Sequence, residues 1–421
     1  MTEEVGVVRR IVWREIFPWL IIFRAFRISV SLPILTLATI GWLLTPLGSQ
    51  IAAAVFLGAE EFSTTRWAVP LNDFLAESES LQAIPGVSTI TSASNPIVYV
   101  FQHFTDPFVQ LFDRSNTVRE TAYHLFRGLW SIAIWAFFAG AITRIATVQL
   151  GRDERIDLRT AVFYAARQYG WSFAAPLFPL FGVFLASLPL IAIGFVLMQV
   201  DVGMIAAGVV WPLALVGGLV MTILLLGLLA GWPLMWPTIS SEEHGDAFEA
   251  FSRSFSYVFQ RPLQYLFYLL LAGVIGGLGW VLVSHVSEAV IQLTYYGTSW
   301  GASNDRVELV AYGDYGVAFG EDTAALQAGV ALIRLFNGLV RIIAMAFNFS
   351  FFFCVMTAIY LVLRRDVDKT DFDEVFVEDD KDSYSLPPLE SKEDSSPTIA
   401  VDSGTETSDE EVSTGDEAAA S

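Results

Sequence analysis

The sequence predicts an all-α fold, a bundle of six membrane-spanning helices with amphipathic helices at one membrane surface and a disordered acidic tail. Three observations carry this prediction: six long apolar stretches, an Arg-bearing amphipathic segment before every second stretch, and acidic residues gathered after residue 365. Crossing a hydrocarbon core about 30 Å thick takes about 20 apolar residues, and each stretch is long enough. The predicted spans are 29–57, 127–150, 173–199, 203–234, 262–284 and 338–363.

Composition agrees with a membrane protein. Hydrophobic residues make up 54% of the chain and charged residues only 16%, with a mean hydropathy of +0.53. A soluble domain carries about 25% charged residues. Cys354 is the only cysteine in the sequence, so it can form no intrachain disulfide. Its place inside the last predicted span is typical of a small apolar core residue.

The net charge of −20 belongs mainly to the C-terminal tail. Residues 366–421 hold 19 Asp and Glu against 3 Lys, whereas residues 1–365 are close to neutral and all their basic residues are Arg. In residues 366–421 the acidic residues alternate with Ser and Thr, and apolar side chains are few. The tail therefore cannot bury enough surface to fold. It is expected to be a solvated tail, with a docking segment for a basic protein partner as the alternative.

Arginine bias sets the predicted topology. Arg residues are concentrated in the N-terminal segment 1–28, before spans three and five, and directly after span six. The outer loops 58–126 and 285–333 are poor in positive charge. Because positive residues stay on the cytoplasmic side, both termini are expected inside. Arg144, near the inner end of span two, is expected to reach toward the headgroups.

The two outer loops are expected to lie at the membrane surface. Apolar residues recur at helical spacing from Val98 through Phe101, Phe104 and Phe108, which predicts an interfacial amphipathic helix. The second loop carries tyrosine and tryptophan between glycines, which is typical of the headgroup level. A ligand-contacting loop is the alternative for that segment.

A repeat runs through the membrane body. Residues 154–161 align with residues 243–250 at a constant offset of 89, and each continues as an amphipathic helix and then a span. Asp157 and Asp246 are predicted helix caps. The N-terminal segment is a looser third copy, so the unit is an interfacial helix plus a two-span hairpin. The aligned residues of interest are Glu154, Asp157, Arg167, Glu243, Asp246 and Arg253.

This pattern, an acidic helix start, an Ala-aromatic-Arg face and then a span, resembles a group of uncharacterised bacterial inner-membrane proteins. Over residues 120–290 it is also remotely similar to the membrane domain attached to some glycerophosphodiester phosphodiesterases. The catalytic domain of those enzymes has no counterpart in this sequence. The resemblance therefore implies an architecture and a location in the bacterial cytoplasmic membrane, and it brings no catalytic residues.

The candidate catalytic and metal-binding motifs lack the surrounding residues that such sites require. Residues 297–301 spell Gly-Thr-Ser-Trp-Gly, but a nucleophile elbow needs a strand-to-helix turn with a later His, and all four His precede Ser299. No His pair has the spacing of zinc ligands. We therefore expect no catalytic residues, no metal and no cofactor.

One polar face stands out in the sixth span. Arg334, Asn337, Arg341 and Asn348 lie at helical spacings of 3, 4 and 7 and so share a face. Ionisable residues inside a membrane are functional candidates because they are costly to bury. The alternative is that Arg341 reaches the outer headgroups, since residues 342–363 suffice to cross the bilayer.

The function predicted first is a non-enzymatic membrane protein that organises or scaffolds other components. The alternative is a transporter or permease with its pathway near Arg341, Asn348 and the proline-rich spans. Expected partners are the lipid bilayer and a protein bound through the acidic tail, with no nucleic acid. The small-residue pairs at 227–231 and 273–277 fit either intramolecular packing or a homo-oligomer.

Overall fold

The structure is a computed structural model that describes residues 17–58, 87–113, 115–243, 245–302 and 324–377. Within these ranges the chain is all-helical, as the sequence predicts. Most of the predicted tail lies outside the described residues, as do residues 1–16 and much of both outer loops.

Six helices are long and apolar enough to cross a membrane, so the chain is a multi-pass integral membrane protein. The number and order of the predicted spans are confirmed, and several helices run beyond the predicted limits because polar residues continue the helical turns. The spanning helices are Leu32–Leu57 (α3, Leu32–Ala52, and η2, Ala53–Leu57), Val118–Gly151 (α7), Tyr169–Leu197 (α9, Tyr169–Ala192, and η4, Ile193–Leu197), Asp201–Ser241 (α10), Pro262–Ser299 (α12) and Ala328–Asp368 within α14 (Ala324–Asp368).

Three short amphipathic helices occupy the positions predicted from the repeat. They are α2 (Ile21–Ser29, after the 3-10 turn η1, Pro18–Leu20), α8 (Leu158–Arg167) and α11 (Ala247–Gln260), here called the collar helices. Asp246 caps α11 by accepting a hydrogen bond from the Glu249 amide at 2.6 Å. Asp157 occupies the same position before α8, but its side chain makes no capping bond, so that part of the prediction is wrong.

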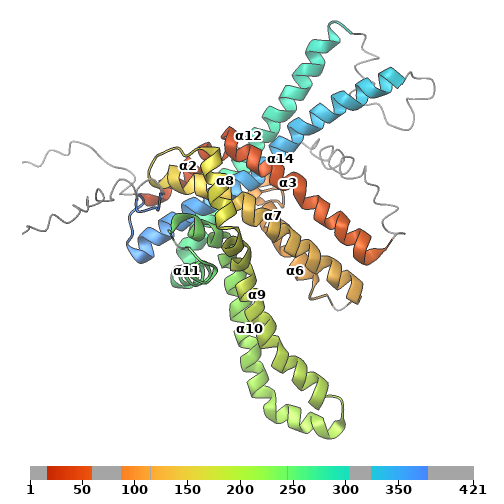
Figure 1. Cartoon of the computed structure of the whole chain (residues 1–421), viewed down its shortest axis with the longest axis vertical. Coiled ribbons are helices and arrows are strands. Elements are labelled where there is room, and N and C mark those ends of the chain that lie inside the picture. Colours follow the sequence, from red (N-terminus) through yellow and green to blue (C-terminus); the bar gives the residue numbers. More distant parts are fainter. Residues whose placement is uncertain (1–16, 59–86, 114, 244, 303–323, 378–421) are drawn as a thin grey trace, which may run out of the picture. The chain divides into compact units, whose positions relative to one another are not determined.

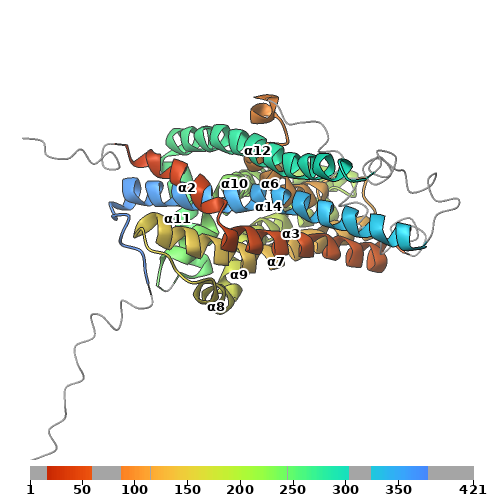
Figure 2. The ribbon, with the colours of Figure 1, turned by 90° about the horizontal axis from the view of Figure 1, so that it is seen from above.

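The spans pair as three hairpins, α3 with α7, α9 with α10, and α12 with α14 (Figure 1). Each collar helix packs mainly on the second span of the preceding hairpin, α8 on α7 and α11 on α10. The first collar helix follows the same rule in a circle, because α2 packs on α14, the second span of the last hairpin (Figure 2). The first spans α3 and α9 also both end in one π-helical turn. The repeat is therefore a cyclic arrangement of three units.

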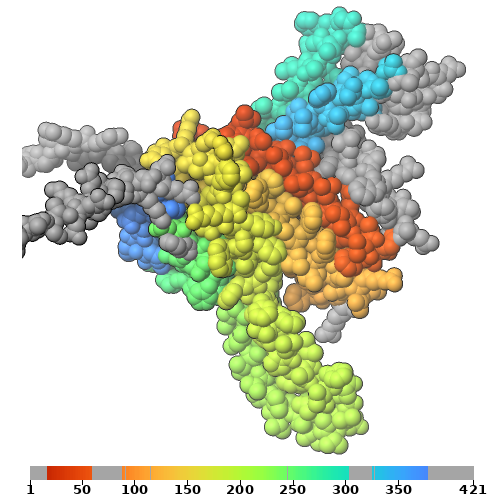
Figure 3. All heavy atoms as spheres, viewed as in Figure 1, coloured from red at the N-terminus to blue at the C-terminus, as the bar shows by residue number. Residues whose placement is uncertain are grey.

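The second spans α7, α10 and α14 contact one another and form the centre. An apolar stretch of 18 residues in α14 is 94% buried. Five phenylalanines lie between Phe347 and Phe353 of this helix, interrupted by Asn348 and Ser350, and all five are buried. The corresponding share for α9 and α10 is 6%, and Figure 3 shows the far part of that hairpin uncovered by other helices on the face in view. Such apolar side chains suit contact with lipid.

The helix predicted to lie on the membrane, α6 (Pro96–Gln110, after the 3-10 turn η3, Val87–Thr91), is inserted among the spans instead. It packs on α7, α14 and α12. Asn95 caps it by accepting from the Ile97 amide at 3.0 Å and donates to the Gly273 carbonyl of α12 at 2.8 Å. Val100 and Phe104 are buried. The interfacial placement was wrong because the apolar face of α6 finds protein rather than lipid.

The packed body extends past residue 365, where the tail was predicted to begin. Lys369 adopts φ 60°, which turns the chain after α14. Residues 371–377 then return across the ends of the central helices, and Phe372 and Val375 are buried. We call the end of the spans that carries the collar helices and this segment the collar end, and the other the far end.

Candidate functional site

The polar face predicted on α14 ties that helix to α12. Arg341 forms an ion pair with Glu288 at 3.3 Å, and the Asn337 amide donates to the Tyr295 hydroxyl at 2.6 Å. The Arg341 side chain is only 15% exposed and is held by Glu288, and its placement at the outer headgroups stays a prediction. Arg334 also has interaction partners. Asn348 is buried further along α14, with an Oδ1 that accepts no hydrogen bond. None of the four lines the cavities described below.

Of the six repeat residues, Asp246 caps α11, and the other five divide into two groups. Glu154, Asp157, Arg167 and Glu243 are exposed at the collar end. Arg253 instead pairs with Glu249 at 2.6 Å and with Glu242 at 2.8 Å.

Glu242, which the sequence did not single out, is the centre of the collar-end charges. Its carboxylate also pairs with Arg364 of α14 at 3.2 Å, so one side chain joins α11 to the last span. The Tyr257 hydroxyl of α11 donates to Asp368. Burial raises the pKa of that hydroxyl, and the neighbouring Tyr360 and Asp368 raise it further, so Tyr257 stays protonated and keeps donating. These contacts are structural and leave no open site.

Arg144 is buried and does not reach toward headgroups. Its guanidinium donates to the Ser240 carbonyl at 2.9 Å and to the Phe376 carbonyl at 2.8 Å, and it lies 4.2 Å from the centre of the Tyr164 ring. The expectation for this residue was wrong because two carbonyls and an aromatic face satisfy the cation inside the protein.

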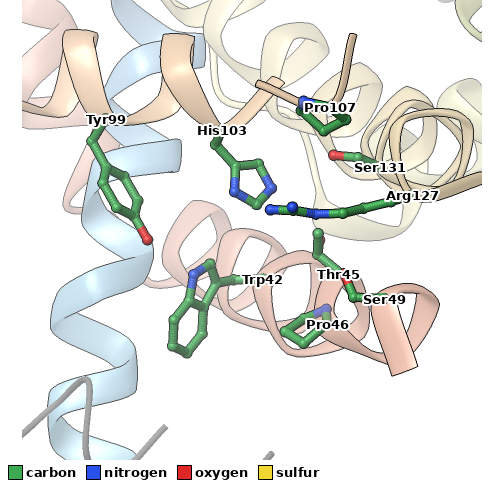
Figure 4. Close-up of a pocket in the computed structure, with 9 residues that line it drawn as sticks. All are labelled: Trp42, Thr45, Pro46, Ser49, Tyr99, His103, Pro107, Arg127 and Ser131. Carbon is green, nitrogen blue, oxygen red and sulfur yellow. The ribbon is translucent and has the colours of Figure 1, made fainter. Parts of the chain in front are cut away.

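A polar cavity of about 230 Å³ lies between α3, α6 and α7. It is many times larger than the roughly 15 Å³ needed for one water. Figure 4 shows the His103 ring of α6 and the Arg127 guanidinium of α7 pointing toward each other above Thr45 of α3. The full lining is Trp42, Thr45, Pro46, Ser49, Tyr99, His103, Pro107, Arg127 and Ser131.

Two polar atoms buried at this cavity have no hydrogen-bond partner, the Nε2 of His103 and the Oγ of Ser131. Arg127 makes no hydrogen bond or ion pair with any residue that the structure describes. Thr45 is already engaged, because it donates to the Gly41 carbonyl and accepts from the Trp135 indole. Buried polar groups are normally satisfied, so the two unpartnered buried atoms beside the half-buried Arg127 indicate a missing ligand or water.

The electrostatics of the cavity are positive. Burial, with the Arg127 charge as the smaller cause, lowers the pKa of His103 to about 4, so His103 is neutral at physiological pH and has one N–H to donate. No Asp or Glu lines the cavity. Arg127 therefore provides the one full charge of the lining, and the groups around it are donors and aromatic rings.

An apolar groove of about 500 Å³ lies on the other side of α6, against α9 and α10. Phe104 lines this groove and lies where the three second spans meet. Its ring lies 4.8 Å from that of Trp232 on α10, 6.2 Å from Trp135 on α7 and 6.3 Å from Phe353 on α14. This aromatic cluster fixes α6 and hence the position of His103, one residue before Phe104.

Sequence reasoning missed this cavity. The hydropathy pattern makes Arg127 the first residue of span two, yet it lies nine residues into α7, about 14 Å along the helix. The signal that could have found it is the same that drew attention to Arg341, an ionisable residue within a span. His103 belonged to a helix expected outside the bundle, so nothing placed it near Arg127.

The chain matches no family model, no curated protein and no solved structure. The resemblance of residues 120–290 to the membrane domain of some phosphodiesterases thus stays a prediction. No group of three or more His, Cys, Asp or Glu side chains in the described ranges could hold a metal ion.

Proposed function

We propose that this membrane protein binds an anionic group in the cavity between α3, α6 and α7. The observation that carries the proposal is the Arg127 guanidinium, which has no partner among the described residues and faces a cavity with two unsatisfied polar atoms. A guanidinium presents a planar fork that matches carboxylate and phosphate oxygens. Ser131 and the neutral His103 add donors beside it. The proposed activity is recognition, with no chemical step.

If the protein is a transporter, we place its pathway at this cavity and no longer near Arg341 and Asn348. Arg341 is closed off by its ion pair with Glu288, whereas the α3–α6–α7 cavity offers room and unsatisfied donors. A binding site among spans suits a protein that senses or carries an anion. The scaffold function predicted first rests on the collar helices and the acidic tail, and it stays a second expectation.

The proposed orientation follows the arginine bias. Collar-end segments hold Arg24, Arg27, Arg152, Arg155 and Arg364 among others, so we place the collar end in the cytoplasm. The cavity then opens in the outer half of the bundle, because α7 begins at the far end and Arg127 lies in its first three turns. We expect the host membrane to be the bacterial cytoplasmic membrane.

The test is anion-dependent stabilisation of the purified full-length protein in detergent. Sulfate, phosphate and acetate are titrated at constant ionic strength with chloride as the reference, and the Tm is recorded. At about 100 times the Kd a bound anion stabilises by roughly 2.7 kcal/mol. Arg127→Gln should weaken the apparent affinity at least about tenfold, equivalent to about 1.4 kcal/mol.

The matched control is Arg119→Gln, which removes the same charge two turns earlier on α7 at an exposed position. It should leave the titration unchanged. Arg127→Lys should bind with intermediate affinity, because it keeps the charge and loses the fork. A Tm that responds equally to all salts in the wild type, or identically in Arg127→Gln, rules the proposal out.

A further inference from the structure

The segment after α14 lies across the collar ends of all three second spans. Arg152 at the end of α7 donates to the Asp373 carbonyl at 3.1 Å, and Arg364 of α14 donates to the Glu374 carbonyl at 2.8 Å. Arg144 donates to the Phe376 carbonyl at 2.8 Å. In return the Phe376 amide donates to the Ser241 carbonyl of α10 at 3.2 Å.

These contacts recognise the main chain. Three guanidinium groups bind three backbone carbonyls, while the side chains of Asp373 and Glu374 are exposed. Carbonyl recognition is independent of side-chain identity. The segment presents these carbonyls around a turn, in which the Glu374 amide donates to the Asp371 carbonyl at 3.3 Å.

Two buried side chains supply the selectivity. Phe372 is 7% exposed and Val375 is 1% exposed, and they lie three residues apart. The Phe372 carbonyl and the Val375 side chain sit against Gly151, where a Cβ would come within 2.6 Å of that carbonyl. Gly151 therefore opens the space that the segment fills. The arginines around it favour a segment with a negative charge.

We infer that the collar ends of α7, α10 and α14 form a peptide-binding groove, occupied here by the chain's own residues 371–377. Its ligand class is a short acidic peptide that adopts the turn of residues 371–374 and carries apolar side chains three residues apart. A peptide of that pattern added in trans competes with the tethered segment. This inference is independent of the anion site, which lies toward the far end.

The test uses a fluorescent peptide of residues 369–377 and the full-length protein. In the variant Phe372→Asp/Val375→Asp the tethered segment is weakened, and the peptide should bind, as measured by anisotropy. The wild type should bind it at least about tenfold more weakly, because the tethered segment competes at an effective concentration on the order of mM. A peptide carrying the same two substitutions should bind neither protein.

The groove itself is tested by adding Arg144→Gln and Arg152→Gln to the weakened variant, which should reduce peptide binding at least about tenfold. Adding Arg155→Gln and Arg159→Gln instead removes two exposed arginines nearby and should not change it. A folded, monodisperse weakened variant that does not bind the peptide contradicts the inference.

A second measurement on the wild type covers the case in which that variant does not fold. The Phe376 amide should be protected from hydrogen exchange, and saturating unlabelled peptide should reduce that protection. Exchange at the unprotected rate without peptide, or protection that the peptide leaves unchanged, overturns the inference.

Discussion

Three arginines of the spans show how the surroundings of a cation decide its role. Arg341 is paired with Glu288, and Arg144 is held by two backbone carbonyls and the Tyr164 ring. Arg127 has neither kind of partner in the described structure and faces a cavity. A cation of this kind is expensive to hold among apolar spans unless a ligand or water completes it. Arg341 therefore joins α14 to α12, Arg144 holds the segment after α14, and Arg127 is the candidate for binding an anion.

At the same scale, Glu242→Gln should destabilise the protein by about 3 kcal/mol, the lower end for breaking a buried pair, since the Glu242 side chain is 18% exposed. The loss leaves Arg253 and Arg364 without their shared carboxylate. The measurement is denaturation in mixed micelles. Glu243→Gln, one residue later and exposed, is the matched control and should cost less than about 1 kcal/mol. Equal losses of stability in the two variants would show that the ion pairs of Glu242 add nothing to the free energy of unfolding beyond what an exposed carboxylate adds.

At the scale of elements, glycines decide how closely helices approach. Gly276 faces the Phe351 ring of α14, and Gly277 faces the backbone of Ile90 in η3, which precedes α6. Gly227 and Gly231 of α10 similarly leave room for Phe255 and Ser254 of α11, which lie against them. Both small-residue pairs noted in the sequence are thus used within the chain. They supply no argument for a homo-oligomer.

Gly277→Val should therefore destabilise the protein by about 1–3 kcal/mol, because its Cβ would lie 3.0 Å from the Ile90 Cα and backbone cannot move aside cheaply. The measurement is the same denaturation in mixed micelles. Gly218→Val is the control, since nothing lies within 4 Å of a Cβ at that glycine of α10. It should change stability by no more than about 0.5 kcal/mol. Similar losses at both positions would indicate a general intolerance of valine in these helices.

Elements differ in how far the sequence predicts them. Span length and hydropathy predict all six spans, and an aspartate with a glutamate three residues later predicts the start of α11 at Asp246. The insertion of α6 was not predictable, because an amphipathic helix with a phenylalanine face suits a membrane surface and a bundle interior equally. The cavity depends on that insertion. It joins side chains of three helices, so Arg127 and His103 could not be related by spacing.

At the scale of the whole packed body, the cyclic order of the three units makes a further prediction. A circular permutant that joins Ser421 to Met1 and opens the chain after Glu154 begins with a collar helix and preserves every unit. It should insert and give monodisperse protein with a Tm close to that of the wild type. A permutant opened at Gln199 separates α9 from α10 and starts with a second span lacking its collar, so it should fail to accumulate. If the permutant opened after Glu154 also fails to accumulate, the cyclic arrangement is contradicted.

An anion bound at Arg127 would be seen directly in a crystal structure of the protein grown with selenate. Anomalous scattering locates selenium independently of the positions assigned to the protein atoms. We predict an anomalous peak in the α3–α6–α7 cavity, with selenate oxygens about 2.7–3.2 Å from the Arg127 guanidinium, and no such peak in Arg127→Gln. An empty cavity at a selenate concentration that saturates the Tm shift, or an unchanged peak in Arg127→Gln, would contradict the anion site.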